Sequence, residues 1–351
     1  MKKLWQIISN LNFKSSPHSA TSQKLEALDL IEDKKLIILK QESTKKITSK
    51  QSHLLDIAVQ TKETSAKDAN SLVFMARPFV QTTLPHRDPC ANEWSRINGK
   101  TTFIIQSGIS MNPDNGKLEH VGIPYGVIPR VLLIWITSEV LQRKTRRLNL
   151  GENLAEFMRK LGLNPNRGGA RGDITRLKEQ LRRLLRCTLS FDQVVRKGDL
   201  ITNNWLNMQI AWKGSMSWIN PKDYHFQSMK KEIDEIGEQS WIELSEPFFE
   251  MVKDSCVPLD HRVLREIKQS PLAIDLYTWM IHRTYSAPSV VDISSKRSFV
   301  AWYQLHGQFG SNYTRIDNFK QKLKPILRQI QALSDNLCLE EARGGLIIKK
   351  K

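Results

Sequence analysis

Cysteine is scarce in this sequence, and its arrangement argues against most metal sites. Four cysteines are scattered along 351 residues, with no Cys-x-x-Cys pair and no His at the spacing of a zinc ligand. Structural zinc sites draw their thiolates from closely spaced pairs, so we expect no bound metal. No other motif indicates a cofactor. Cys187 and Cys338 lie in or beside apolar segments, and we interpret them as small core residues.

Long hydrophobic runs are also missing. No apolar stretch approaches the roughly 20 residues that a membrane-spanning helix needs. The first eight residues faintly resemble the start of a signal peptide, but Ser9, Asn10 and Lys14 interrupt the apolar run. We therefore expect a cytoplasmic protein that does not contact a membrane.

Catalytic motifs are absent as well. Gly99–Thr101 resembles the end of a phosphate-binding loop, but Trp94 stands where the leading glycine belongs, and a strand follows instead of a helix. A nicking enzyme would place paired His ligands near a nucleophilic tyrosine, yet there is no His-x-His pair and Tyr313 has no His beside it. We interpret His86–Asp88 and Asp260–His261 as structural groups. The sequence predicts no catalytic residues and no enzyme.

Positive charge is plentiful and concentrated. The net charge is +17. Residues 143–186 contain thirteen Lys and Arg against four Asp and Glu, and residues 296–351 contain eleven against four. These two segments account for nearly all of the excess. A concentrated basic face is typical of a protein that binds the phosphate backbone of nucleic acid.

The two basic segments contain a repeated phrase. Residues 174–186 (ITRLKEQLRRLLR) recur as residues 316–328 (IDNFKQKLKPILR) at an offset of 142. Apolar residues fall at i, i+3, i+7, i+10 and i+11, so each copy predicts an amphipathic helix with a basic outer face. Two such helices suggest two DNA-facing modules in one chain.

The duplication extends to both sides of this phrase. Pro129 and Pro271 each open a predicted helix, and a short amphipathic segment then ends at Gly162 or Gly310. After each repeated helix comes a strand, a glycine turn and a second strand. Three helices followed by a β-hairpin form a winged helix. The sequence thus predicts an α+β protein with two tandem winged-helix domains.

We predict three parts along the chain. Residues 1–70 form a flexible, basic, partly helical arm; residues 71–238 hold the first winged helix with a linker; residues 239–351 hold the second. We expect residues 101–106 to form a hairpin with residues 117–121, and residues 241–245 to form an edge strand leading into the second domain.

Candidate DNA contacts lie on the outer face of each repeated helix. In the second copy, Arg315 could bind guanine and Asn318 adenine, while Thr314 could instead be the N-cap of the helix. Pro325 should kink this helix. The residues that we expect to contact DNA in the second domain are Asn312, Tyr313, Thr314, Arg315, Asn318, Lys322 and, from the wing, Arg343.

In the first domain, a glycine-rich cationic loop leads into the basic helix and is suited to backbone contact more than to base reading. The residues expected to contact DNA there are Arg167, Arg171, Arg176, Lys178, Arg182 and Arg183. Alternatively, Leu132, Ile136 and the strand near residues 102–106 could serve a dimer interface, with the arginines paired to acidic residues of a partner.

Several stretches resemble the plasmid-encoded replication initiators of the RepA type. The likeness covers residues 71–351 and is carried by residues 73–86 (VFMARPFVQTTLPH), 122–130 (GIPYGVIPR), 154–163 (LAEFMRKLGL), 169–178 (GARGDITRLK) and 270–279 (SPLAIDLYTW). It implies tandem winged helices that bind directly repeated sites (iterons) at a plasmid origin. It also implies opening of an adjacent AT-rich stretch.

The resemblance further implies a division of labour and partners. The C-terminal domain would read bases, and the N-terminal domain would contact the backbone and mediate a monomer–dimer equilibrium in which the dimer represses its own gene. A host initiator ATPase and the replicative helicase would be partners. Two alternatives remain: a winged-helix transcriptional regulator that opens no DNA, and a primase or nicking enzyme with an unrecognised site.

Overall fold

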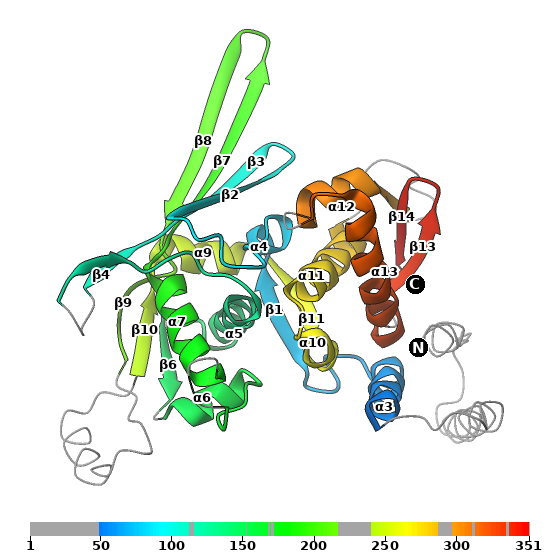
Figure 1. Ribbon diagram of the computed structural model, residues 1–351, viewed down its shortest axis with the longest axis horizontal. Helices are drawn as coiled ribbons and strands as arrows, with labels where there is room; N and C mark the ends of the chain where they lie inside the picture. The colour runs from blue at the N-terminus through cyan, green and yellow to red at the C-terminus, as the bar shows by residue number, and fades with distance from the viewer. Residues whose placement is uncertain are drawn as a thin grey trace.

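A computed structural model describes most of the chain from residue 49 onward and shows mixed helices and strands (Figure 1), confirming the predicted α+β class. The predicted arm up to residue 48 lies outside the described residues, and so do most of the predicted linker and the glycine-rich loop at 170–171. The described ranges are 49–111, 116–151, 153–167, 169, 172–216, 240–286, 297–310, 313–334 and 337–350.

The elements follow one another along the chain in this order: α3 (Ser49–Glu63), β1 (Leu72–Ala76), α4 (Arg77–Gln81), β2 (Glu93–Asn98), β3 (Thr101–Gln106), β4 (Ile109–Met111), β5 (Leu118–His120), α5 (Val127–Arg143), β6 (Arg147–Gly151), α6 (Leu154–Lys160), α7 (Asp173–Arg186), β7 (Thr188–Lys197), β8 (Leu200–Met208), β9 (Ala211–Ser215), β10 (Ser240–Leu244), α9 (Glu246–Asp254), β11 (Cys256–Asp260), α10 (His261–Ile267), α11 (Pro271–Ser286), β12 (Arg297–Ala301), α12 (Trp302–Phe309), α13 (Ile316–Leu333), β13 (Leu337–Ala342) and β14 (Gly345–Lys350).

The duplicated pattern of the sequence corresponds to a duplicated order of elements. The first unit runs α5, β6, α6, α7, β7, β8, and the second runs α11, β12, α12, α13, β13, β14. Pro271 is the first residue of α11, as predicted, while α5 begins two residues before Pro129. Helix α6 is followed by Gly162 in the left-handed region (φ +66°), where a glycine carries no Cβ penalty. The helices and hairpins predicted from the repeat are confirmed.

The two units differ in how their strands pair. In the second unit β12, β14 and β13 form one three-stranded antiparallel sheet. In the first unit the β7–β8 hairpin belongs to a separate sheet of order β2-β3-β7-β8, and this hairpin projects far from the body of the molecule (Figure 1). The phenyl rings of Phe103 and Phe191 stack at 4.7 Å between centroids on this sheet.

Two strand predictions are wrong. Strand β3 pairs with β2 and β7, whereas residues 118–120 form β5, which pairs with the short β4. Strand β10 is not an edge strand leading into the second unit. It lies between β6 and β9, both within the predicted first domain (residues 71–238). Ile242 and Leu244 are buried there, and their alternation fixes which face of the strand points to the core but is compatible with an edge or a central position.

The two units pack against each other. Strand β1 pairs with β11 along five residues, and α11 packs against α4 and α5. Helix α3, in the segment predicted as an arm, is folded and packs against α10 and α13, with Leu54 and Ala58 buried. The buried side chains form one continuous hydrophobic cluster through both units.

A buried ion pair joins α5 to α11. The Arg130 guanidinium donates to both carboxylate oxygens of Asp275, at 2.6 and 2.7 Å, and to the carbonyls of Leu84, Pro85 and Gly126. Both side chains are almost completely buried. Burial by itself would raise the pKa of the Asp275 carboxyl, but Arg130 and His86 outweigh it and hold that pKa at about 2.

His86 completes this cluster. Its Nε2 lies 2.8 Å from the Asp275 carboxylate. Burial lowers the pKa of His86 in spite of that contact, which favours the neutral imidazole. Because the ionised carboxylate can only accept, Nε2 carries the proton and donates it. The cluster is therefore neutral overall, with every polar atom of Asp275 engaged by a donor.

Candidate nucleic-acid interface

Helix α13 has the two faces that its sequence predicts. Phe319, Leu323, Leu327 and Ile330 are buried, and Ile316 is half-buried. The opposite face is exposed at the positions predicted to point outward: Arg315, Asn318, Gln321 and Lys322. The exposure of these side chains is confirmed, and their contact with DNA stays a prediction.

The start of α13 is held in place by α12. The His306 Nε2–H donates to the carbonyl of Tyr313 at 2.7 Å, and the His306 ring meets the Phe319 ring edge-on at 5.5 Å. The Tyr313 ring also packs against Phe319, at 5.7 Å. Tyr313 thus anchors the turn between the helices, and Asn312 lies outside the described residues. The N-cap is Arg315, so the alternative reading of Thr314 as the cap is wrong.

Two of the three lysines of α13 form ion pairs. Lys320 lies 3.7 Å from Asp317, and Lys324 lies 2.5 Å from Glu341 on β13. Arg315 and Lys322 have no ion pair with any described residue. Arg315 and Lys322 are therefore available to a phosphate or a base, and both lie in the N-terminal half, where a recognition helix reads bases.

Pro325 lies in the interior of α13 on its exposed face, and the helix continues through it to Leu333. Proline has no N–H, so the helical hydrogen bond that would reach the carbonyl of Gln321 is not formed. That carbonyl lies on the same exposed face as Lys322. It is an acceptor on a surface otherwise rich in donors.

The β13–β14 hairpin carries one further residue that was predicted to contact DNA. Arg343 is exposed at the turn between β13 and β14, next to Gly344 at φ +89°. Lys349, by contrast, forms a close ion pair with Glu340 across the hairpin. Arg343 is therefore the more accessible of these two cations.

In the first unit, Arg183 is fixed by the protein itself. Its guanidinium donates to Asp88 at 2.9 Å, to Glu179 at 2.6 Å and to the carbonyl of Ile123 at 3.1 Å. It also stacks over the Tyr125 ring at 5.2 Å, and only 14% of the side chain is exposed. This geometry gives Arg183 a structural role that the spacing of α7 did not indicate.

The other basic residues of the first unit are more accessible. Arg167, Arg176 and Lys178 are exposed, and Arg182 is half-buried. Arg176 has one weak neighbour, Asp173, at 3.8 Å. Arg171 lies outside the described residues. Two exposed arginines at equivalent positions of the two copies, Arg186 and Arg328, were missed, although their identity at the 142-residue offset could have singled them out.

The predicted dimer interface is wrong in part. Leu132 and Ile136 are fully buried in the core of the first unit and are not available to a partner. Strand β3 lies inside its sheet between β2 and β7. The outer strands of this sheet are β2 and β8, and on β8 the side chains of Leu200, Ile201, Trp205 and Leu206 are exposed, Trp205 to 66%. An exposed edge strand presents unpaired backbone N–H and C=O groups that can pair with another chain.

The described residues contain neither a candidate metal site nor a membrane-spanning helix. No group of three His, Cys, Asp or Glu side chains among them could hold a metal ion. None of the helices in this part of the chain is long and apolar enough to cross a bilayer.

Comparisons with known proteins identify the chain's family. Two crystal structures of domains 2 and 3 of RctB are similar at 12% identity and a TM-score of 0.43, covering 77% and 78% of this chain and 94% and 96% of theirs. A comparison with curated proteins gives no match. The family model described as plasmid-encoded RepA protein matches residues 123–304, which include the whole first unit and the second unit from α11 to the start of α12. Because this match covers more than half of the sequence, the chain belongs to the plasmid-encoded RepA protein family, and membership supports a role in replication initiation.

Proposed function

We propose that the protein initiates plasmid replication by binding directly repeated sites through two tandem winged helices. The observation that carries this proposal is the exposed N-terminal half of α13, with Arg315 and Lys322 unpaired among the described residues and Asn318 between them. The β13–β14 hairpin beside this helix would be the wing, with Arg343 against a neighbouring phosphate. The repeated order of elements supports a second winged helix in the first unit.

The two units would contact different parts of the DNA. The second unit would read bases, because an arginine can bind guanine in a bidentate manner and an asparagine can do so with adenine. The first unit would contact the backbone through Arg176, Lys178 and Arg167, which are exposed cations without a bidentate carboxylate partner. Arg183 takes no part in this surface, since its terminal nitrogens bond to Asp88, Glu179 and the carbonyl of Ile123 and only 14% of its side chain is exposed.

Self-association would use the edge of the β2-β3-β7-β8 sheet. Antiparallel addition of a second β8 would satisfy the outer backbone groups of this strand and cover Trp205 and Ile201. The dimer would repress the gene and the monomer would bind the origin. Host initiator ATPase and replicative helicase would be recruited to the opened DNA. All of these steps are assembly and strand opening, without covalent chemistry.

Footprinting on plasmid DNA that carries the gene and its flanks tests the proposal. We expect regularly spaced protection of direct repeats, with permanganate-reactive thymines in an adjacent AT-rich stretch. Protection of a single inverted repeat without reactive thymine would instead indicate a transcriptional repressor. Metal-dependent cleavage or synthesis on the same DNA would indicate an enzyme.

The same footprint separates base reading from backbone contact. Arg315→Ala and Asn318→Ala should each lose about 1–3 kcal/mol of discrimination, seen as reduced protection of the repeats relative to random DNA. Lys253→Gln serves as the control, because Lys253 is an exposed cation on α9 paired with Glu250 at 2.9 Å. An equal loss on repeats and on random DNA would assign Arg315 and Asn318 to the backbone instead.

A further inference from the structure

A cavity of about 180 Å³ lies between the two units. Helix α5 and strand β1 contribute walls from the first half of the chain, and α10 and α11 contribute walls from the second. This volume exceeds the roughly 150 Å³ that accommodates a benzene ring in a protein interior. Its lining residues are Val73, Val131, Ile134, Trp135, Ser138, Glu139, Gln142, Lys160, Leu161, Gly162, His261, Leu264, Arg265, Lys268 and Ile274.

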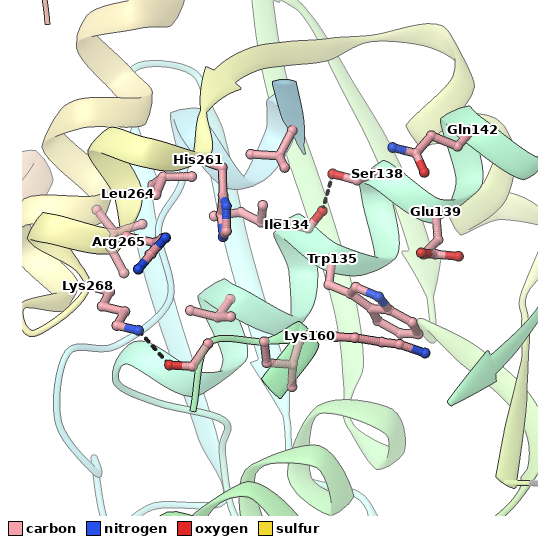
Figure 2. A pocket seen from close by; sticks show the side chains of 15 residues that line it. Ile134, Trp135, Ser138, Glu139, Gln142, Lys160, His261, Leu264, Arg265 and Lys268 are labelled. Carbon is pink, nitrogen blue, oxygen red and sulfur yellow. Dashed lines mark hydrogen bonds between the residues drawn. The ribbon is translucent and has the colours of Figure 1, made fainter. Parts of the chain in front are cut away.

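Three basic side chains share one wall of this cavity. His261, Arg265 and Lys268 follow one another at i, i+4 and i+7, a spacing that places them on one face at the α10 segment. Figure 2 shows all three on the same side, with the Trp135 ring on the opposite side. The rest of the lining is mainly aliphatic. The cavity therefore combines an apolar body with a cationic wall.

Arg265 and Lys268 lack a matching counter-charge among the described residues. Burial first, and then the neighbouring cations, lower the pKa of both His261 and Lys268, while Asp260, Glu266 and Asp173 only partly oppose this. Glu266 already contacts His53 at 3.2 Å. Of the described acids, none forms an ion pair with Arg265. An anion beside Arg265 and Lys268 would relieve the mutual repulsion.

The remaining charged groups of the lining are engaged elsewhere. Lys160 pairs with Glu156 at 2.9 Å, and Glu139 pairs closely with Arg143 on the outer turn of α5. Lys268 donates one hydrogen bond, at 2.5 Å, to the carbonyl of Gly162, which orients its ammonium along the cavity wall. An ammonium has three donors, so two remain for a ligand.

We propose that this cavity binds a small apolar carboxylate, with its hydrocarbon body against Trp135 and Ile134 and its carboxylate on Arg265 and Lys268. A guanidinium matches the two oxygens of a carboxylate in geometry as well as charge. The half-buried cavity is large enough for a single ring and too small for a helix or strand of a partner protein. This inference does not depend on the proposed DNA-binding function.

Ligand-observed NMR with 3-phenylpropanoate tests the proposal, and 3-phenylpropanamide is the neutral comparison. A probe of this size should bind with a Kd of about 1 mM. The amide should bind about tenfold more weakly, since it loses the charge-assisted hydrogen bonds. Equal binding of the two compounds would overturn the carboxylate site. Absence of binding at about 10 mM would overturn the cavity as a ligand site altogether.

Variants of the full chain locate the binding. Arg265→Gln should weaken binding of the carboxylate about tenfold while leaving binding of the amide unchanged. Val131→Phe should abolish binding of both by filling the cavity, with thermal unfolding measured to verify that this variant folds. Lys253→Gln, a cation removed outside the cavity, should change neither. Retention of full carboxylate affinity in Arg265→Gln would refute the assignment of the anionic end.

Discussion

Replacing Asp275 with Asn removes the only ion-pair partner that the described residues give to the buried Arg130 guanidinium. The new amide retains the shape of the carboxylate but not its charge, and it presents one oxygen where Arg130 now meets two, at 2.6 and 2.7 Å. Three backbone carbonyls remain as acceptors for Arg130. The buried cation is then left without a compensating charge.

The expected cost follows from this burial. Breaking a buried ion pair by removing one partner typically costs about 3–5 kcal/mol. The Arg130 side chain is only 1% exposed, so water cannot replace the lost partner, and we expect the full range for Asp275→Asn. Against a total stability of about 5–15 kcal/mol, this change should lower the unfolding midpoint markedly.

The effect should depend on pH. Because the pKa of Asp275 is depressed to about 2 in the folded protein, the carboxylate stabilises the fold above its ordinary pKa and loses this contribution as the pH falls. The difference between wild type and Asp275→Asn should therefore be constant above about pH 4 and shrink by about 2 kcal/mol toward pH 2.

Urea denaturation followed by circular dichroism measures both effects. The matched comparison is Arg130→Met/Asp275→Leu, which replaces the pair by apolar side chains and should be more stable than Asp275→Asn, because no uncompensated charge stays buried. If Asp275→Asn cost less than about 1 kcal/mol, or if the double variant were the less stable, the reasoning about a charge without a partner would be refuted.

Three further outcomes are expected. Lys322→Gln should reduce the slope of log affinity against log salt concentration by about 0.9 on double-stranded DNA. Lys324→Gln should change this slope much less, because the Lys324 ammonium is already paired with Glu341. Equal slopes for the two variants would contradict the placing of Lys322 in the DNA-binding surface. Arg183→Gln should cost about 1–3 kcal/mol of stability in urea denaturation with no specific change in the salt slope, and a change only in DNA affinity would argue against its structural role. Trp205→Lys should weaken self-association about tenfold or more in sedimentation equilibrium if β8 is the interface, and an unaltered dimer would place the interface elsewhere.

The sequence by itself determined the helices of the two repeated units, the hairpin that follows each repeated helix, and the outward face of α13. These features depend on contacts between residues a few positions apart. The alternation that buries Phe319 and Leu323 also exposes Asn318 and Lys322, and both sets are read from a period of 3.6 residues. The repeat between α7 and α13 could be found in the same way, because each copy keeps its own local pattern.

The local sequence pattern did not determine which distant strands pair with one another. The segment of β10 carries an apolar alternation that is compatible with an edge or a central position, and only the folded chain brings β6 and β9 to its two sides. Helix α3 likewise has a weak sequence pattern, and its Leu54 and Ala58 are buried only because α10 and α13 lie beside it.

Only the tertiary structure decided which basic side chains are free to contact DNA. Arg183 and Arg176 occupy similar positions on the face of α7, but Asp88 and the carbonyl of Ile123 reach only Arg183. Arg130 and Asp275 are 145 residues apart in sequence and meet in the core. The type of a residue shows whether its side chain is charged. Which group pairs with that charge depends on how the whole chain folds, because the energy of a charge is set by the groups that surround it.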